Sequence, residues 1–318
     1  MVAVPDPADE PMPQTPNPIP WWEPQLGDPV RQAVNAVLDS DYINDGPVTR
    51  ALEARLAEIA GTRFGVATTS CTAALALALM ATGIGPGDEV IVPDATFIAT
   101  ANAVRLAGAQ VRLVDVDPVT MTIDAARVAA AIGPATKAVI AVDLNGRSAD
   151  YAGLTTLCDK HGLILICDSA QGLGSMIGGR GLGSFGKAGC FSFSGNKMFF
   201  AGQGGAVVTD DEAVHDRLRT LRDHGRRTAG TGGDDLHPVV GYNFKYPNLQ
   251  AAVTLAQLDA LEERRGHARQ RQQWYRELLD GCPGLTIPGA DHDGEFILWA
   301  DILVENRDAV CTALETAG

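Results

Sequence analysis

Residues 163–172 read L-I-L-I-C-D-S-A-Q-G, a short apolar run that ends in Asp168 and a turn. The run lacks polar alternation, which is typical of a strand buried on both faces within a parallel sheet. K-A-V-I-A-V-D at 137–143 and E-V-I-V-P at 89–93 have the same character. We therefore expect an α/β fold in which helices cover both faces of a mostly parallel sheet.

Helix and strand signals alternate on both sides of this stretch. The expected helices are 28–40, 47–60, 72–82 and 97–107, and further strands are expected at 64–68, 110–116, 191–193 and 206–209. After residue 245 the pattern changes to one long helix or two joined ones over 248–280, a strand over 296–304 and a helix over 306–316. This change indicates a second, smaller unit after a large α/β domain.

The composition excludes several classes of protein. The formal net charge is −14, and a surface this acidic repels nucleic acid and anionic membranes. Six cysteines form no C-x-x-C pair, so we expect reduced cysteines, no metal site and a cytoplasmic protein. The proline-rich residues 1–20 predict a disordered or extended arm without a signal peptide, and no segment reaches the length of a membrane span.

A lone lysine carries the strongest functional signal. Residues 189–205 read G-C-F-S-F-S-G-N-K-M-F-F-A-G-Q-G-G, which places Lys197 between aromatic residues and before a glycine cluster. Apolar surroundings disfavour an ammonium group, so the amine becomes a usable nucleophile. A lysine that forms a Schiff base with an aldehyde cofactor such as pyridoxal phosphate needs this environment. From this stretch alone, a solvated lysine in a surface turn stays an equal alternative.

Two further residues follow expected strands and have competing interpretations. Asp168 ends a strand, and ligands of open α/β sheets bind beyond the carboxyl ends of the strands. A carboxylate there can pair with a protonated pyridine nitrogen, although it can equally cap the next turn. Phe97, after the strand 89–93, can stack on a flat ring or pack as a core aromatic.

A phosphate site is expected where T-T-S-C-T-A-A-L at 68–75 leaves a strand and opens a helix. The backbone N–H groups of Cys71, Thr72 and Ala73 would point at an anion there. The alternative is that Ser70 or Thr72 only caps the helix, and both interpretations can hold together. Ser192 lies five positions before Lys197 and would add a hydroxyl to the same phosphate.

Five blocks occur in order along the chain and point to one family. They are T-S-C-T-A-A-L-A-L-A-L from 69, G-P-G-D-E-V-I-V-P-D-A-T-F from 85, I-C-D-S-A-Q-G-L-G-S from 166, F-S-F-S-G-N-K from 191 and V-G-Y-N-F-K from 240. In these blocks the sequence resembles the DegT/DnrJ/EryC1/StrS family of sugar aminotransferases, from about residue 20 to residue 280.

The resemblance implies a type I, aspartate-aminotransferase-like fold that works as a homodimer with pyridoxal 5'-phosphate. Lys197 would form the Schiff base, Asp168 would pair with the pyridine nitrogen, and Gln171 would contact the phenolic oxygen of the ring. The remaining implied contacts are Phe97 stacking on the ring, Cys71, Thr72 and Ser192 at the phosphate, Asn243 at the partner's cofactor phosphate, and Lys245 nearby.

The chain also departs from the family pattern. Cys71 stands where the family usually has glycine, and V-D-L-N-G at 142–146 replaces the common V-H-L-Y-G, so the sugar specificity of the family is not carried over. Family members normally continue beyond this endpoint, which predicts a truncated small domain. We thus expect an arm at 1–20, a large cofactor-binding domain at 21–250, and a linking helix with a partial small domain at 251–318.

The implied reaction moves an amino group from glutamate or glutamine to a keto sugar, expected to be nucleotide-linked. A keto-cyclitol aminotransferase remains open as an alternative. A cofactor-dependent sugar dehydratase is a further alternative, but that branch replaces the lysine with histidine, so Lys197 argues against it. A regulatory or inactive member of the fold is the alternative outside enzymes.

Overall fold

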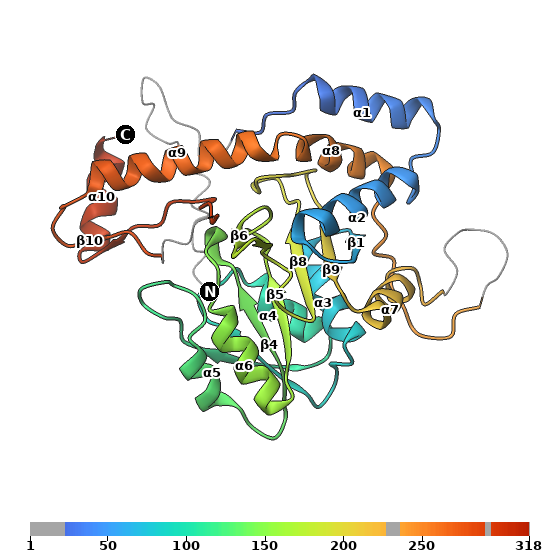
Figure 1. Ribbon diagram of the computed structural model, residues 1–318, viewed down its shortest axis with the longest axis horizontal. Coiled ribbons are helices and arrows are strands. Elements are labelled where there is room, and N and C mark those ends of the chain that lie inside the picture. The colour runs from blue at the N-terminus through green and yellow to red at the C-terminus, as the bar shows by residue number, and fades with distance from the viewer. Residues whose placement is uncertain (1–22, 227–235, 290–293, 318) are drawn as a thin grey trace, which may run out of the picture.

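A seven-stranded sheet forms the centre of the molecule (Figure 1). The computed structural model describes residues 23–226, 236–289 and 294–317, so the expected arm at 1–20 lies outside the described residues. The strand order is β1-β9-β8-β5-β4-β2-β3. The strands are β1 (Phe64–Thr68), β2 (Glu89–Pro93), β3 (Gln110–Val114), β4 (Thr136–Val142), β5 (Ile164–Asp168), β8 (Ala188–Ser192) and β9 (Gly205–Thr209). β9 runs antiparallel to both of its neighbours, whereas the other pairs in this sheet are parallel.

Helices cover both faces of the sheet, as the apolar strands predict. The helices are α1 (Asp28–Asp39), α2 (Pro47–Ala60), α3 (Cys71–Ala81), α4 (Ala99–Leu106), α5 (Ala125–Ala131), α6 (Tyr151–His161), α7 (Glu212–Arg222), α8 (Asn248–Leu258), α9 (Leu261–Leu279) and α10 (Arg307–Ala317). Shorter elements are a 3₁₀ turn (Leu144–Gly146), β6 (Met176–Ile177), β7 (Arg180–Gly181), β10 (Leu285–Thr286) and β11 (Leu303–Val304).

The alternation of side chains along each strand divides the core into layers. Ile140 and Ile166 pack on one face of the sheet, together with α3, α4 and α7. Their neighbours Val139 and Leu165 face the opposite side, where α5 and α6 cover one half of the sheet. α2 and α8 cover the other half of that side, over Phe191 and its surroundings. The strands are therefore buried on both faces, which explains their unbroken apolar sequences.

The sequence left open whether residues 248–280 form one long helix or two joined helices. The long helix predicted over 248–280 is two helices, α8 and α9, which run nearly end to end across the molecule (Figure 1). α1 lies beside α8, while α9 leads to β10 and α10 at the far end (Figure 1). The division of the chain near residue 250 stays a prediction. α8, which follows this point, packs with α2 in the core of the large domain, whereas α9 leads away from it.

The strand expected over 296–304 was wrong for most of its length. Only Leu303 and Val304 form a strand, which pairs with β10. The backbone of the preceding residues bonds instead to the large domain: Ser175 Oγ accepts from the N–H of Phe296, and Asn145 O accepts from the N–H of Leu298. Because these partners come from separate loops, the apolar run crosses the large domain without joining a ladder.

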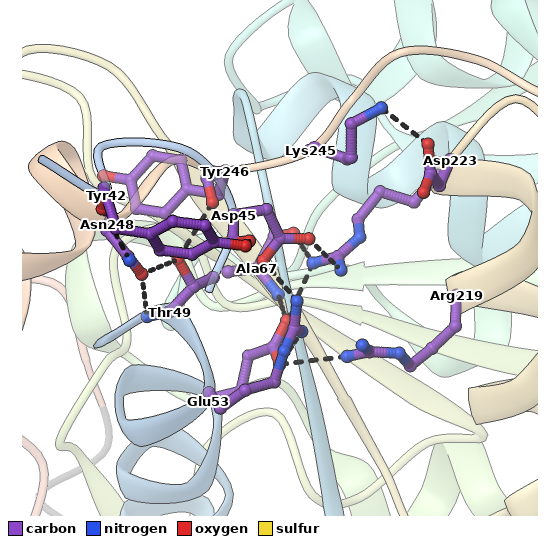
Figure 2. A network of polar contacts seen from close by, with 12 residues as sticks. Tyr42, Asp45, Thr49, Glu53, Ala67, Arg219, Asp223, Lys245, Tyr246 and Asn248 are labelled. Carbon is purple, nitrogen blue, oxygen red and sulfur yellow. Dashed lines mark hydrogen bonds and ion pairs between the residues drawn. The ribbon is translucent and has the colours of Figure 1, made fainter. Parts of the chain in front are cut away.

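A cluster of buried charges ties α2, α7 and β1 together (Figure 2). Arg222 on α7 donates to Glu53 Oε1 at 2.8 Å, to Asp45 Oδ2 at 2.9 Å and to the carbonyl of Ala67 at 2.7 Å. Arg219 donates to the other Glu53 oxygen at 3.1 Å. These contacts fix the loop before α2 against the sheet, although the three segments lie far apart in sequence.

Four cysteines are buried, whereas Cys282 and Cys311 are exposed, and all six are free thiols. The expectation that the cysteines are reduced is consistent with this arrangement, but the two exposed residues are not part of the core. Within the described ranges, no helix has the length and hydropathy needed to cross a membrane.

Candidate active site

Several residues singled out in the sequence meet at one edge of the sheet. Asp168 is the last residue of β5, Ser192 is the last residue of β8, and Cys71 opens α3 just after β1. β1, β5 and β8 run in the same direction, so their carboxyl ends lie together. This edge is where open α/β sheets bind ligands.

Asp168 is buried at this edge, with 5% of its surface exposed. Its Oδ2 accepts from Thr100 Oγ1 at 2.7 Å, and its Oδ1 accepts from the N–H of Ala170 at 3.2 Å. Burial raises the pKa of Asp168, while these two hydrogen bonds and the charge of Lys197 lower it. The contact with Ala170 is the turn cap foreseen as the alternative, yet Oδ2 faces away from that turn, toward α4.

Lys197 lies in the turn after β8 and is only partly exposed. Its backbone N–H donates to the carbonyl of Ser194 at 3.0 Å, which fixes the turn. Burial lowers the pKa of the Lys197 amine, whereas the nearby Cys71 and Asp168 raise it. The amine also lies 5.9 Å from the centre of the Trp299 ring. Lys197 is therefore not a freely solvated surface lysine, and its amine is easier to deprotonate than an ordinary one.

The N-terminus of α3 is closely packed and lies near Lys197. Ser70 caps the helix by accepting from the N–H of Ala73 at 3.1 Å, as the capping interpretation predicts. A Cβ built on Gly205 would lie 2.5 Å from the amide nitrogen of Cys71, so β9 approaches this helix end closely. Burial raises the pKa of the Cys71 thiol well above its usual value, with Asp168 adding to the rise and Lys197 opposing it. Cys71, Asp168 and Lys197 thus lie close enough to affect one another's pKa values.

Ser192 and Phe97 differ in exposure. Ser192 is buried, and its Oγ accepts from the N–H of Ser194 at 3.3 Å. Phe97 lies two residues before α4, and 72% of its surface is exposed. The expectation that Phe97 begins the helix and the alternative that it packs in the core were both wrong for this chain. An exposed aromatic side chain at this edge is available for a ligand to cover.

Gln171 is held by a residue that the sequence reasoning did not single out. Gln171 Oε1 accepts from the backbone N–H of Asn145 at 2.5 Å. This orientation leaves both hydrogens of the amide group to donate elsewhere. Thr100 and Asn145 were both missed. Thr100 lies one helical turn after Phe97, a spacing that signals a shared face, whereas Asn145 lies in the V-D-L-N-G stretch, which was noted only as a departure from the family pattern.

Asn243 lies away from these contacts. It is exposed and forms an isolated β-bridge with Asp223, while Lys245 Nζ contacts Asp223 Oδ1 at 2.6 Å (Figure 2). The neighbouring carbonyl of Phe244 accepts from the N–H of Thr69, close to the start of α3. Among the contacts of the described residues, none joins Asn243 to Lys197.

A cavity of about 930 Å³ opens beside Lys197. α8, α9 and the segment around Trp299 line most of it, and residues just before and within α1 complete the wall. Arg264, Arg271 and Asp301 are among its polar residues. The cavity is large enough for a ligand of several rings.

Comparison with known proteins identifies the family. The DegT/DnrJ/EryC1/StrS aminotransferase family matches residues 24–318. The UDP-N-acetyl-3-dehydro-alpha-D-glucosamine 3-aminotransferase of Acidithiobacillus ferrooxidans is 42% identical over 92% of this chain and 78% of its own. GDP-perosamine synthase of Caulobacter vibrioides is 36% identical over 93% of this chain and 81% of its own.

Solved structures agree with these relatives. DesV of S. venezuelae, solved in complex with a ketimine intermediate, has a TM-score of 0.84 and 36% identity over 91% of this chain and 77% of its own. 3-Amino-5-hydroxybenzoic acid synthase has a TM-score of 0.87 and 31% identity over 94% of this chain and 80% of its own. The chain therefore belongs to the DegT/DnrJ/EryC1/StrS family and is an aminotransferase of the type I fold.

Proposed function

We propose that this aminotransferase binds pyridoxal 5'-phosphate through Lys197 and transfers an amino group from glutamate or glutamine to a nucleotide-linked keto sugar. The observation that carries the proposal is that a buried carboxylate, Asp168, and the partly buried amine of Lys197 lie at the carboxyl edge of the sheet, close enough for the charge of each to shift the pKa of the other. Relatives named for UDP-linked and GDP-linked sugar chemistry support the choice of acceptor.

The residues at this edge fit the cofactor. The hydrogen-bond donors to Asp168 are the neutral groups of Thr100 and Ala170, so a protonated pyridine nitrogen would give this buried carboxylate a cationic partner. Phe97 offers an exposed aromatic side chain for stacking, and the amide of Gln171 has hydrogens for the phenolic oxygen. The backbone amides of Cys71 and Thr72, with the Ser192 hydroxyl, would hold the phosphate.

Each protein group has a separate task in the proposed reaction. When bound, the cofactor supplies the carbonyl group that carries the amino group and a ring that accepts electrons from the substrate carbon. Lys197, with its lowered pKa, would take the proton from the α-carbon of the donor on Nζ and deliver it to the former aldehyde carbon of the cofactor, on the other side of the amino nitrogen. An ionised Asp168 would hold the ring nitrogen in its protonated form and thereby keep the ring positively charged.

We also propose a cytoplasmic homodimer with shared active sites. Asn243 is exposed rather than directed into its own chain, which suits a contact with the cofactor phosphate of the partner subunit. Large apolar side chains are also exposed at Ile98 and Val240. Apolar surface of this kind is expected to be covered by another chain. Sedimentation of the purified protein and cofactor retention by Asn243→Ala test this assembly.

The cofactor and its lysine can be tested together. The purified protein should have a visible absorption band that disappears on adding glutamate or glutamine. Borohydride reduction followed by peptide mapping should place the pyridoxyl label on Lys197. A label on Lys187 or Lys245 would show that the lysine is misassigned, and no absorption change with either donor would reject the aminotransferase half-reaction.

The acceptor needs a separate assay. A panel of nucleotide-linked keto sugars and keto-cyclitols should be added to the amino form of the enzyme, and recovery of the absorption band should be followed. Recovery with nucleotide sugars at lower concentration than with cyclitols supports the proposal. A preference for cyclitols would replace the proposed substrate class while leaving the cofactor assignment in place.

A further inference from the structure

The segment 294–301 crosses the candidate site without forming a helix or strand. It is nevertheless held along its length by the large domain. Gly294 O accepts from the N–H of Met176 at 2.9 Å, and a Glu295 oxygen accepts from the N–H of Ser148 at 2.8 Å. Leu298 N–H donates to the carbonyl of Asn145 at 2.8 Å. These bonds fix the backbone on one side of Trp299.

Asp301 fixes the backbone on the other side of Trp299. Its Oδ2 accepts from Asn145 Nδ2 and from Arg147 Nη2, each at 2.6 Å. The Arg147 side chain is 3% exposed and also donates from Nε to the carbonyl of Thr120 at 3.0 Å. We call Asn145, Arg147 and Asp301 the clamp. A charge-assisted contact to a buried guanidinium is among the stronger hydrogen bonds in proteins.

The clamp connects directly to the residues proposed to hold the cofactor. The backbone N–H of Asn145 donates to Gln171 Oε1, while its side chain donates to Asp301. From the opposite side, Arg271 on α9 donates to the carbonyls of Ile297 and Leu298, both at 2.8 Å. Trp299 therefore lies between two anchored points, and its position is set relative to Gln171.

Trp299 lies close to the amine that moves the proton in the proposed reaction. Its ring centre is 5.9 Å from Lys197 Nζ. In both half-reactions the reacting carbon of the substrate must lie within reach of the lysine amine that moves its proton, so a six-membered acceptor ring would extend into the space beside the indole. The carbon-bound hydrogens on one face of such a ring make an apolar surface that suits an aromatic side chain.

From these contacts we propose that Trp299 is a specificity-determining residue that forms the wall of the acceptor subsite, and that the clamp is the positioning device that holds it there. The inference rests on the proposed function and adds to it the part of the chain that recognises the acceptor ring. Glutamate and glutamine have no ring to place on the indole, so Trp299 discriminates between the two half-reactions.

The test measures the two half-reactions separately, from the loss of the cofactor band with glutamate and its recovery with the best keto acceptor from the panel. Trp299→Ala should lower kcat/KM for the acceptor by about 10–100-fold, the scale of losing a shaped apolar contact. The rate with glutamate should stay within about twofold of wild type. Trp299→Phe should retain most of the acceptor activity, because it keeps an aromatic face.

Asp301→Asn tests the clamp, since it removes the ion pair with Arg147 while preserving the shape of the side chain. Its acceptor KM should rise several-fold with kcat nearly unchanged, because a displaced Trp299 weakens binding without altering Lys197. Trp274→Ala is the matched control: Trp274 lies on α9, is 55% exposed and is not among the residues lining the cavity. Both half-reactions of this variant should equal those of wild type.

The outcomes separate the inference from the proposed function. Equal losses in both half-reactions of Trp299→Phe, or unchanged acceptor kinetics in Trp299→Ala, would overturn the role of Trp299. A wild-type enzyme that responds to no donor and no acceptor would reject the proposed function, and this inference with it. If Trp299→Ala does not fold, Trp299→Phe and Asp301→Asn still decide the question through the acceptor KM.

Discussion

The Arg222 cluster and the Lys197 site both bury charge, but they compensate it differently. In the Arg222 cluster, three arginines and two carboxylates meet within hydrogen-bonding distance (Figure 2). Arg222 reaches Asp45 and Glu53 at once, and Arg50 contacts the same two carboxylates. Glu53 further accepts from the backbone of Ala67. Each carboxylate in this cluster therefore has an opposite charge beside it.

The Lys197 site has no such compensation. Asp168 accepts from a threonine hydroxyl and a backbone amide; its neighbour Asp143, whose N–H donates to the carbonyl of Asp168, accepts from the hydroxyls of Ser169 and Tyr151. Among the described residues, no ion pair within 4 Å joins Lys197 to either carboxylate. Burial consequently raises the pKa of Asp143 to about 7 and lowers the pKa of Lys197.

This difference indicates that the Arg222 cluster stabilises the fold, whereas the Lys197 site is suited to function. Paired buried charges tie distant segments together and are costly to break. When a buried ionisable group has no counter-ion in the protein, a bound ligand sets its protonation state. Such groups are typical of sites that perform acid and base chemistry. The two regions should therefore respond to mutation in opposite ways, and the predictions below run from the largest expected effect to the smallest.

The largest effect is expected for Lys197→Ala on activity. Removing the amine that moves the proton should slow the glutamate half-reaction by about 10²–10⁴-fold or more. The free energy of unfolding of the apo-protein should change by less than about 1 kcal/mol, because the amine forms no ion pair with the residues that the structure describes. Single-turnover kinetics and urea unfolding measure the two quantities. A destabilisation larger than the Arg222 variant shows would break the comparison.

The next effect is a loss of stability in Arg222→Met. Asp45 and Glu53 would lose a buried partner, so the free energy of unfolding should fall by about 3–5 kcal/mol. The half-reaction rates of the protein that remains folded should stay within about twofold of wild type. Arg217→Ala on the same helix is the control, because Arg217 is exposed and donates only to a backbone carbonyl in the described structure. Urea unfolding of both variants checks the expectation.

The next prediction concerns Asp143→Asn and the pH dependence of the free energy of unfolding. The folded pKa of about 7 lies above the unfolded value, so between about pH 4 and pH 7 the folded state holds more protons than the unfolded state. The Asp143 contribution to stability therefore falls as the pH rises through this window and levels off above it. Relative to the variant, wild type should lose stability by up to about 1.4 kcal/mol per pH unit.

Urea unfolding at intervals from pH 5 to pH 8 measures this difference. Stability curves for wild type and Asp143→Asn that stay parallel over the whole range would mean that Asp143 does not titrate in the window. A difference that grows only above pH 7 would place the titration elsewhere.

The smallest effect is expected for Lys187→Ala. Lys187 forms a partly exposed pair with Asp211, and such pairs contribute about 0–1 kcal/mol. Neither the free energy of unfolding nor the half-reaction rates should change beyond that range. Raised salt should reduce even this contribution, which unfolding measurements at two ionic strengths would detect. A large loss of activity would instead make Lys187 a competitor of Lys197.

Much of the fold was predictable because its signals are local. The bounds of β1 and β2 match the expected strands, and Gly61 ends α2 with a positive φ of 76° as its sequence position indicates. Ser70 caps α3 as one interpretation required. The strand predicted over 296–304 was wrong for most of its length, because an apolar run does not distinguish a strand paired in a sheet from an extended segment that forms hydrogen bonds with distant loops.

The sequence by itself determined the α/β alternation and the family, and it singled out Asp168 and Lys197 as the proposed site residues, because each depends on spacing within a few dozen residues. Only the tertiary structure decided which groups surround them. Asn145 and Asp301 are 156 positions apart, and Arg222 and Glu53 are 169 apart, so no local pattern records either contact. The folded sheet brings the carboxyl ends of its parallel strands to one edge, and that convergence turns separate motifs into a site.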